Sequence, residues 1–199
     1  MTHASILVSI SFIDKIKTVD YWLFSKINGS WHNGFLDNLF PILREAYTWL
    51  PFYLFLLLFT IVNYRKKGLY WAICLIVIAG LSDFISSSII KEHVFRLRPC
   101  HNPLLAEHIR VLAAYCPQSS SFTSSHATNH FAAAMFIFMT FRKAISKWWV
   151  LIFAWAALIC YAQVYVGVHF PFDVFAGAIL GASIGYFAAF LFNKKLGLQ

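Results

Sequence analysis

The chain has 199 residues, of which 60% are hydrophobic and only 12% are charged. A soluble globular domain carries about 25% charged residues, so this composition excludes an ordinary soluble domain and predicts an integral membrane protein. The formal net charge is +8. The basic residues stand in short loops between apolar runs, which indicates topology control and contact with the lipid bilayer, and nucleic acid is not expected as a partner.

The N-terminal segment, residues 1–43, mixes large apolar side chains with charged ones such as Asp14, Lys15 and Lys17. These charges interrupt any window of about 20 residues, the length that a membrane-spanning helix needs. We therefore expect amphipathic helices that lie in the membrane interface, with a sixth span as the alternative. The first residues lack a basic leader and a clear cleavage site, which is atypical of a signal peptide.

Five apolar runs follow, and most of them approach the length of about 20 residues that a span requires. They cover residues 47–63, 68–90, 127–141, 148–165 and 174–192. The fold prediction is an all-α, polytopic helical bundle in the membrane. It has five transmembrane helices in a core over residues 47–192, or six if the N-terminal segment also spans. No linker or low-complexity tract divides the chain, so residues 1–199 are expected to form one domain.

Clusters of lysine and arginine predict the orientation of the bundle. With five spans, the clusters within residues 65–67, 142–147 and 194–195 fall on one side, which the positive-inside rule makes cytoplasmic. Three polar blocks then gather on the opposite, outer side: residues 91–99, 121–126 and 167–173. This places the C-terminus in the cytoplasm and a candidate site toward the periplasm or exterior.

The first polar block presents three cations where the chain leaves the bilayer. Lys91 and Arg98 are seven residues apart, two helical turns, so they are predicted to share a helical face, and Pro99 is predicted to end the helix. Arg96 is the third cation. Guanidinium forks and an ammonium group suit a phosphate. Because these cations lie opposite the other basic clusters, phosphate binding is favoured over ordinary snorkelling.

The other two blocks add groups that transfer protons or attack. Ser124 and Ser125 precede His126 at the start of the third run, where hydroxyls cap a helix and open amides favour an anion. His169 and Asp173 are spaced i, i+4, so in a helix the carboxylate would hold one ring tautomer and leave the other nitrogen free to attack. Helix capping or an interfacial histidine would explain each block alone. Together they predict phosphoryl transfer.

The three blocks resemble the signature of the type 2 phosphatidic acid phosphatase family, membrane lipid phosphate phosphatases related in fold to vanadium haloperoxidases. That signature reads Lys, six residues, Arg-Pro; then Pro-Ser-Gly-His; then Ser-Arg, five residues, His, three residues, Asp. The resemblance covers residues 83–180. The matching residues, in order, are Lys91, Arg98, Pro99, Ser124, His126, His169 and Asp173.

The resemblance implies a role for each matching residue. His169 would be the nucleophile that forms a phosphohistidine, Asp173 would orient it, and His126 would be the general acid. The phosphate would be bound by Lys91, Arg98 and Ser124. The family requires no metal, so no cofactor is expected.

Two departures from the signature bear on activity. Ala162 and Gln163 stand where serine and arginine are expected, and loss of an arginine at a desolvated phosphate costs on the order of a few kcal/mol. Either Arg96 or another cation compensates, or the substrate is less demanding, or the activity is weak. Thr123 stands for proline, and Ser125 stands for glycine. Ser125 either crowds the phosphate or contributes a further hydroxyl.

The predicted function is hydrolysis of a phosphorylated membrane lipid at the outer face of a bacterial inner membrane. Undecaprenyl diphosphate is the preferred substrate, with phosphatidylglycerol phosphate, phosphatidic acid and a lipid A phosphate as alternatives. A non-catalytic lipid-phosphate binder or transporter, which Gln163 would suit, and a lipid phosphotransferase are the other hypotheses. A rival enzyme is a metal-dependent hydrolase in which His126, His130 and His169 hold the metal together with Asp173, although the nearby cations would repel it.

Two further features of the outer half remain open. Cys100 and Cys116 lie in the same outer loop and are candidates for a disulfide, which would close a loop of about 15 residues and contribute about 3 kcal/mol. Asp83 lies within the second span, where an acid is either a hydrogen-bond anchor or part of a route for substrate.

Overall fold

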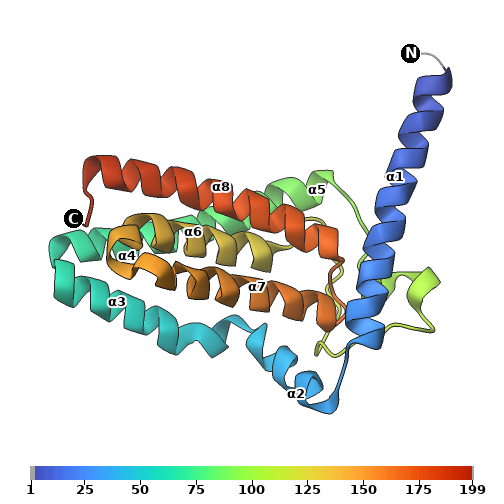
Figure 1. The fold of residues 1–199 in the computed structure, drawn as a ribbon, viewed down its shortest axis with the longest axis horizontal. Helices are drawn as coiled ribbons and strands as arrows, with labels where there is room; N and C mark the ends of the chain where they lie inside the picture. Colours follow the sequence, from blue (N-terminus) through green and yellow to red (C-terminus); the bar gives the residue numbers. More distant parts are fainter. Residues whose placement is uncertain (1–2, 199) are drawn as a thin grey trace.

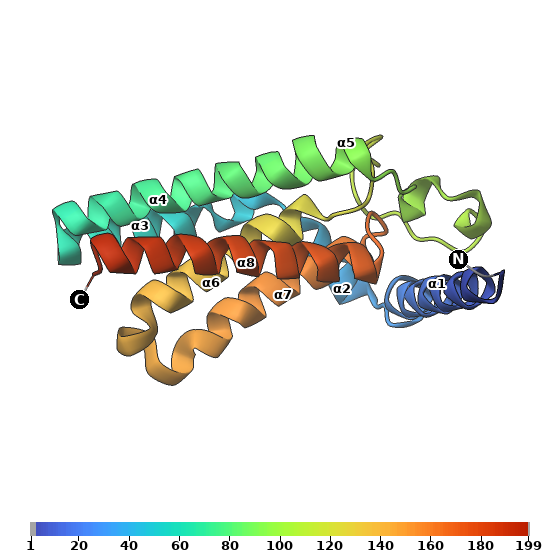
Figure 2. The same ribbon diagram turned by 90° about the horizontal axis from the view of Figure 1, so that it is seen from above.

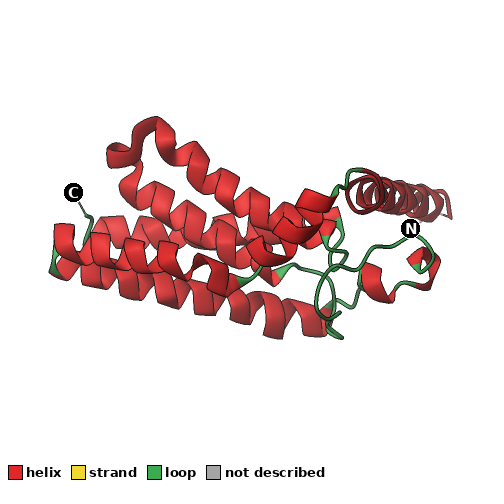
Figure 3. Ribbon diagram, turned by 90° about the horizontal axis from the view of Figure 1, so that it is seen from below, coloured by secondary structure: helices red, strands yellow, loops and turns green. Residues whose placement is uncertain are grey.

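The structure is a computed structural model that describes residues 3–198. Over these residues the regular elements are helical, in agreement with the all-α prediction, and no strand is formed (Figure 3). The longer helices are α1 (His3–Phe24), α2 (Gly34–Leu43), α3 (Leu50–Tyr64), α4 (Lys66–Asp83), α6 (Ser125–Ile145), α7 (Trp149–Tyr165) and α8 (Pro171–Lys195). A π-helical segment, Phe84–Ile90, joins α4 to the short α5 (Lys91–His93).

Each of the five predicted apolar runs forms a long helix, namely α3, α4, α6, α7 and α8. Within residues 3–198, three continuous helical stretches are long and apolar enough to cross a membrane: Ala46–Tyr64, Lys66–His93 and Pro171–Lys195. Helix α7 is apolar but shorter, and α6 runs beside these helices in the bundle (Figures 1 and 2). The polytopic membrane bundle is therefore confirmed.

The two ends of the bundle differ in chemistry. The α3–α4 turn, the α6–α7 turn and the C-terminus lie together at one end, and all three basic clusters belong to them (Figure 1). The end of α5, the start of α6 and the α7–α8 junction lie at the opposite end, where the three polar blocks gather (Figure 1). The predicted separation of basic clusters from polar blocks is present in the fold.

The N-terminal helices lie at the polar end. Helix α1 runs across this end of the bundle rather than along it (Figures 1 and 2), and it is not among the described stretches that meet the criteria for a span. It exposes Ile16, Val19 and Trp22 but buries Asp20. This arrangement agrees with the expected amphipathic helix rather than with a sixth span.

Close packing of α8 on α6 fixes the geometry of the polar end. At Gly181 and Gly185 of α8 an added Cβ would overlap the carbonyl oxygens of Thr128 and Ala132 on α6. Small residues allow two helix backbones to approach this closely within a membrane. The contact continues to the end of the helices, where the N–H of Ser124 donates to the carbonyl oxygen of Asp173 at 3.1 Å.

One local prediction is wrong. Lys91 and Arg98 do not share a helical face, because the helix ends at His93 and the backbone is extended at both Val94 and Arg98. Pro99 contributes to this, since the residue before a proline avoids the helical conformation. The extended segment is also held by pairing with the second block, where the N–H of Ser121 donates to the carbonyl oxygen of Arg96 at 2.9 Å.

Candidate active site

Arg98 and His169 lie against each other in the buried part of the polar end. Nη1 of Arg98 is 3.1 Å from Nε2 of His169 and also donates to the carbonyl oxygen of Val168 at 3.1 Å. A guanidinium only donates, so Nε2 is the acceptor and Nδ1 carries the proton of the neutral ring. Arg98 is 4% exposed and His169 is 3% exposed. An unprotonated histidine nitrogen therefore faces a cation away from bulk water.

The environment keeps the His169 ring neutral. Burial lowers the pKa of His169 to about 4; the nearby carboxylate of Asp173 opposes this shift and the positive charge of Arg98 adds to it. At neutral pH the ring is therefore uncharged, which is the form in which histidine acts as a nucleophile.

Asp173 is fixed at the start of α8. Its Oδ2 atom accepts the N–H of Phe170 at 2.9 Å, as a helix cap, and lies 3.8 Å from Nδ1 of His169. Pro171 is the first residue of the helix, a position that suits proline. His169 precedes the helix, so the predicted i, i+4 pair is not a pair on a helical face. The carboxylate reaches the ring because it folds back to cap the helix.

Arg96 is engaged by two carboxylates. Its Nη1 atom donates to Oδ1 of Asp173 at 2.6 Å, and Nη2 donates to Oδ2 of Asp20 at 2.5 Å. The other oxygen of Asp20 accepts the N–H of Phe172 at 2.9 Å. The guanidinium also lies over the ring of Phe170, 4.2 Å from its centroid. Asp20 is 76 residues from Arg96, so no local pattern in the sequence points to it.

Lys91 reaches the site through Ser125, which stands where the signature has glycine. The Nζ atom of Lys91 donates to Oγ of Ser125 at 2.8 Å. The same Oγ lies 3.0 Å and 2.9 Å from the hydroxyls of Ser86 and Ser87 in the π-helical segment. Ser87 in turn donates to the exposed Asp83 at 3.2 Å, which makes that acid a hydrogen-bond anchor.

The second block forms the beginning of α6. Oγ of Ser124 accepts the N–H of Ala127 at 3.4 Å, so Ser124 caps this helix. His126 lies in the first turn. The hydroxyl of Ser125 before it accepts from Nζ of Lys91, and the backbone N–H of Ser124 donates to the carbonyl oxygen of Asp173. The three polar blocks are therefore brought together.

His130 is packed between helices. Its Nδ1 atom is 2.8 Å from the carbonyl oxygen of His126, and its Nε2 atom is 3.3 Å from the hydroxyl of Tyr53. The ring also packs edge-on against Trp155. Because both ring nitrogens are occupied, His130 is not presented with His126 toward a common point.

The side chains of the metal hypothesis do not converge. In the described part of the chain, one group of three histidine, cysteine or carboxylate side chains lies close enough to share a metal ion, and it consists of Cys100, His101 and Cys116. Two of these are joined as a disulfide. His126, His130, His169 and Asp173 form no such group, so their arrangement does not favour a metal centre.

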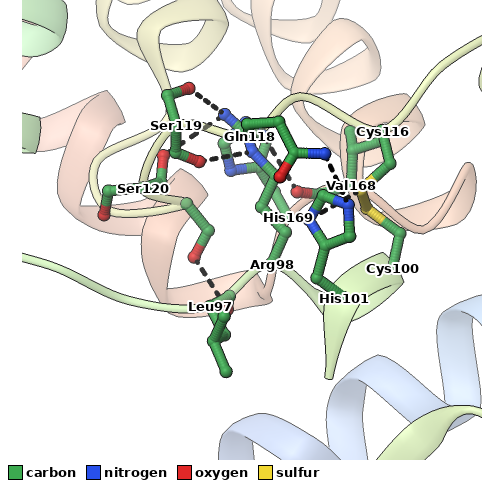
Figure 4. The surroundings of a disulfide bond; sticks show 11 residues. Leu97, Arg98, Cys100, His101, Cys116, Gln118, Ser119, Ser120, Val168 and His169 are labelled. Atoms are coloured by element: carbon green, nitrogen blue, oxygen red, sulfur yellow. Dashed lines mark hydrogen bonds between the residues drawn. A yellow bond between two sulfur atoms is a disulfide. The ribbon is translucent and has the colours of Figure 1, made fainter. Parts of the chain in front are cut away.

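The disulfide joins Cys100 and Cys116 beside the site (Figure 4). Arg98 precedes it by two residues and donates from Nε to the carbonyl oxygen of Ser119 at 2.9 Å and from Nη2 to that of Ser120 at 3.2 Å. The bridge therefore ties the segment that carries Arg98 to the segment that holds its guanidinium. A cross-link closing a loop of this size contributes about 3 kcal/mol.

Besides Nδ1 of His169, two buried side chains in this region have polar atoms without hydrogen-bond partners among residues 3–198. Gln163 is fully buried, and neither its Nε2 nor its Oε1 has a hydrogen-bond partner. Arg44, at the end of α2, is 6% exposed, and its Nε has no partner. Burial, and then the charge of Arg44, lower the pKa of Arg98 against the opposing effect of Asp173. The sequence could have pointed to Arg44 in one way only: it is a cation that directly precedes the first apolar run, on the predicted outer side.

Comparison with known proteins decides the family. The pattern of the PAP2 superfamily matches residues 70–196, a range that contains all three polar blocks. The chain belongs to the PAP2 superfamily. It is 29% identical over 176 residues to a lipid A 4'-phosphatase of Porphyromonas gingivalis, over 88% of this chain and 73% of that protein. It is 30% identical over 172 residues to the undecaprenyl-diphosphatase BcrC of Bacillus subtilis, over 84% of this chain and 81% of that protein.

A solved structure agrees with the fold. The PAP2-type phosphatidylglycerolphosphate phosphatase of Bacillus subtilis superposes on this PAP2 protein with a TM-score of 0.70, over 96% of this chain and 92% of that chain, at 22% identity. Family, fold and apolar spans together make the chain an integral membrane lipid phosphatase of the PAP2 type.

Proposed function

We propose that this PAP2 protein hydrolyses a phosphate ester or diphosphate of a membrane lipid through a phosphohistidine on His169. The contact between Arg98 and His169 is the observation that supports this best. It presents an unprotonated Nε2 beside a cation, and these are the nucleophile and the positive charge that phosphoryl transfer needs.

The first step forms the phosphohistidine. As Arg98 donates to the phosphoryl oxygens instead of to Nε2 of His169, that nitrogen attacks phosphorus. The phosphorus–nitrogen bond forms, and the bond between phosphorus and the leaving oxygen breaks. His126 gives its proton to that oxygen. Asp173, 3.8 Å from Nδ1, stabilises the positive ring that results.

The second step releases phosphate. Water attacks the phosphohistidine, His126 takes a proton from that water, and the phosphorus–nitrogen bond breaks. The phosphoryl oxygens are held by Lys91, Arg98, Ser124, Ser125 and Gln163. Arg96, whose guanidinium bridges Asp173 and Asp20, positions Asp173 and does not bind the phosphate.

The site lies at the end of the bundle opposite the basic clusters, which by the positive-inside rule supports an outer, periplasmic location in a bacterial inner membrane. We rank lipid A 4'-phosphate first as substrate, because the lipid A 4'-phosphatase relative matches 88% of this chain. Undecaprenyl diphosphate, preferred from the sequence, ranks second. Either lipid would keep its apolar tail in the bilayer while its phosphate enters the polar end.

The test is phosphate release in detergent from four lipids: lipid A, undecaprenyl diphosphate, phosphatidylglycerol phosphate and phosphatidic acid. The parent is compared with His169→Ala and with His108→Ala, an exposed loop histidine as matched control, each with and without EDTA. We expect release that persists in EDTA and in His108→Ala and is absent from His169→Ala.

Three other results would each favour a different hypothesis. Release abolished by EDTA would favour the metal-dependent hydrolase. No release from any lipid by folded protein would favour a lipid-phosphate binder. Transfer of labelled phosphate to a second lipid without stoichiometric free phosphate would identify a phosphotransferase.

A further inference from the structure

The centre of the site has one cation fewer than the PAP2 signature expects. The signature places an arginine at position 163, and this chain has glutamine there. Gln163 is fully buried, and both polar atoms of its side chain lack partners among residues 3–198. A buried amide is costly to leave without hydrogen bonds, so this position is suited to a polar ligand.

Arg96, the nearest cation in the sequence to the signature residues, does not supply the missing charge. Each of its terminal nitrogens is bound to a carboxylate, Asp173 on one side and Asp20 on the other. Its positive charge is therefore already compensated, and its donors are directed at those two acids.

Arg44 is placed to supply this charge. The backbone N–H of Arg44 donates to the carbonyl oxygen of Phe40 at 3.1 Å. Nε1 of Trp49 donates to the carbonyl oxygen of Leu43 at 2.8 Å. Leu43 packs on the buried cluster that contains Ala162, the residue before Gln163. The end of α2 is thus held against α7 next to the departure from the signature.

The charge of Arg44 is poorly compensated by protein groups. Its one ion pair within the described residues is with Glu45, at 3.5 Å, and Nε has no partner. Meanwhile its charge acts on Arg98 and on His126, two residues of the signature. A buried cation is stable only when it is paired, and a second buried cation whose charge acts on Arg98 fits an anion.

We infer that Arg44 binds the phosphoryl group of the substrate in place of the arginine that the PAP2 signature has at position 163. Its guanidinium would donate to the phosphoryl oxygens beside Arg98, with the amide of Gln163 as an additional donor. The identity of the ligand as a lipid phosphate rests on the proposed function above.

The experiment exchanges the two positions. Five variants are compared with the parent: Arg44→Ala, Arg44→Lys, Gln163→Arg, the double variant Arg44→Ala with Gln163→Arg, and Arg142→Ala. Arg142 is an exposed arginine in the last turn of α6 and serves as the matched control. Two quantities are measured: kcat/KM for the lipid, and affinity for orthovanadate, from the rise in unfolding temperature in detergent.

Arg44→Ala is expected to lower kcat/KM about 100-fold, the effect of removing one transition-state donor, and to weaken orthovanadate binding about tenfold or more. The double variant is expected to regain about tenfold of each, because a new arginine at position 163 restores the charge. Arg142→Ala is expected to match the parent.

Two results would overturn the inference. One is folded Arg44→Ala with the kcat/KM and the orthovanadate affinity of the parent. The other is loss of turnover with unchanged orthovanadate affinity and no rescue by Gln163→Arg, which would make Arg44 structural.

Should Arg44→Ala fail to fold, Arg44→Lys is compared with a sixth variant, Arg44→Gln. Affinity for orthovanadate kept by lysine and lost by glutamine supports the inference, and equal affinity in both contradicts it. Should the parent hydrolyse no lipid, the proposed function fails, while the orthovanadate measurements still test Arg44.

Discussion

The Nζ atom of Lys91 lies 2.8 Å from Oγ of Ser125. Lys91 matches the PAP2 signature, whereas Ser125 stands where the signature has glycine, so the departing residue holds the matching one. The same hydroxyl contacts Ser86 and Ser87. Ser125 therefore links the end of the second span to the start of α6. The extra hydroxyl restrains the lysine in addition to occupying the space that glycine would leave open.

Replacing Ser125 with alanine is expected to lower kcat/KM about tenfold, because a hydrogen bond to a charged donor contributes about 1.5–3 kcal/mol. Lys91→Ala should cost about 100-fold, since it also removes the cation. Ser88→Ala changes an exposed serine of the same π-helical segment and is the matched control. Steady-state kinetics on the best lipid of the panel would measure all three, and parent-like activity of Ser125→Ala would show that the contact has no role in turnover.

Arg96 bridges Asp20 and Asp173. Breaking this bridge is expected to lower kcat and to leave the affinity for a phosphate analogue unchanged. Arg96→Ala or Asp20→Asn should lower kcat by about 10- to 100-fold, because small displacements of a positioning group are costly. Orthovanadate affinity should change little. Asp14→Asn, at an exposed position of α1, controls for loss of a negative charge. If Arg96→Ala weakens orthovanadate binding as strongly as Arg44→Ala, then Arg96 binds the phosphate after all.

The contact between α6 and α8 predicts a large effect from a small substitution. Gly181→Leu should destabilise the protein by at least 1–3 kcal/mol, roughly the cost of overpacking a tight contact, and should reduce activity by separating His126 from His169. Gly80→Leu is the matched control, because an added Cβ at Gly80 meets nothing within 4 Å. Thermal unfolding in detergent compares the two, and equal unfolding temperatures would show that the close approach is not required.

The burial of His169 predicts a pH dependence of stability. Its pKa is about 4 in the folded protein and about 6.5 in an unfolded chain. Between these values the unfolded state binds more protons, so the contribution is fully present above about pH 6.5 and is lost as the pH falls toward 4. The loss amounts to about 3 kcal/mol at most.

Unfolding temperatures measured from about pH 7.5 to pH 5 test this linkage. The parent should lose stability more steeply than His169→Asn, whereas His108→Asn, at an exposed histidine, should follow the parent. Identical slopes for the parent and His169→Asn would show that the ring titrates normally in the folded protein.

Much of the fold follows from the sequence because hydropathy and loop charges act locally. The run at residues 174–192 lies within α8, Pro171–Lys195, and the run at 148–165 corresponds to α7, Trp149–Tyr165. Prediction from helical spacing fails at Arg98, where the sequence indicates that the helix continues. There the backbone is extended because it pairs with residues 120 and 121, for example through Oγ of Ser120 and the carbonyl oxygen of Val94 at 2.7 Å. Such tertiary pairing leaves no periodic pattern in the sequence.

The same distinction holds for the site. Lys91, Arg98, Ser124, His126, His169 and Asp173 have fixed spacings within each block, so a signature finds them. Asp20 and Arg44 come from α1 and α2, outside the matched residues 70–196, and reach the site only through the fold. A residue that replaces the missing arginine at position 163 also reaches the site only through the fold. Such a residue must lie close to the site in space, but it needs no particular spacing in the chain.

The most direct test of the account is whether His169 itself becomes phosphorylated. Parent protein would be mixed with the best lipid substrate, quenched in alkali within milliseconds to seconds, digested, and analysed by mass spectrometry for a phosphoryl group on the peptide that contains His169. We expect an acid-labile phosphoryl group on His169 that appears during turnover, decays as substrate is consumed, and is absent with His169→Ala. A parent that turns over the lipid with no phosphoryl group on His169 under any quench time, or with one on His126 instead, would contradict the mechanism.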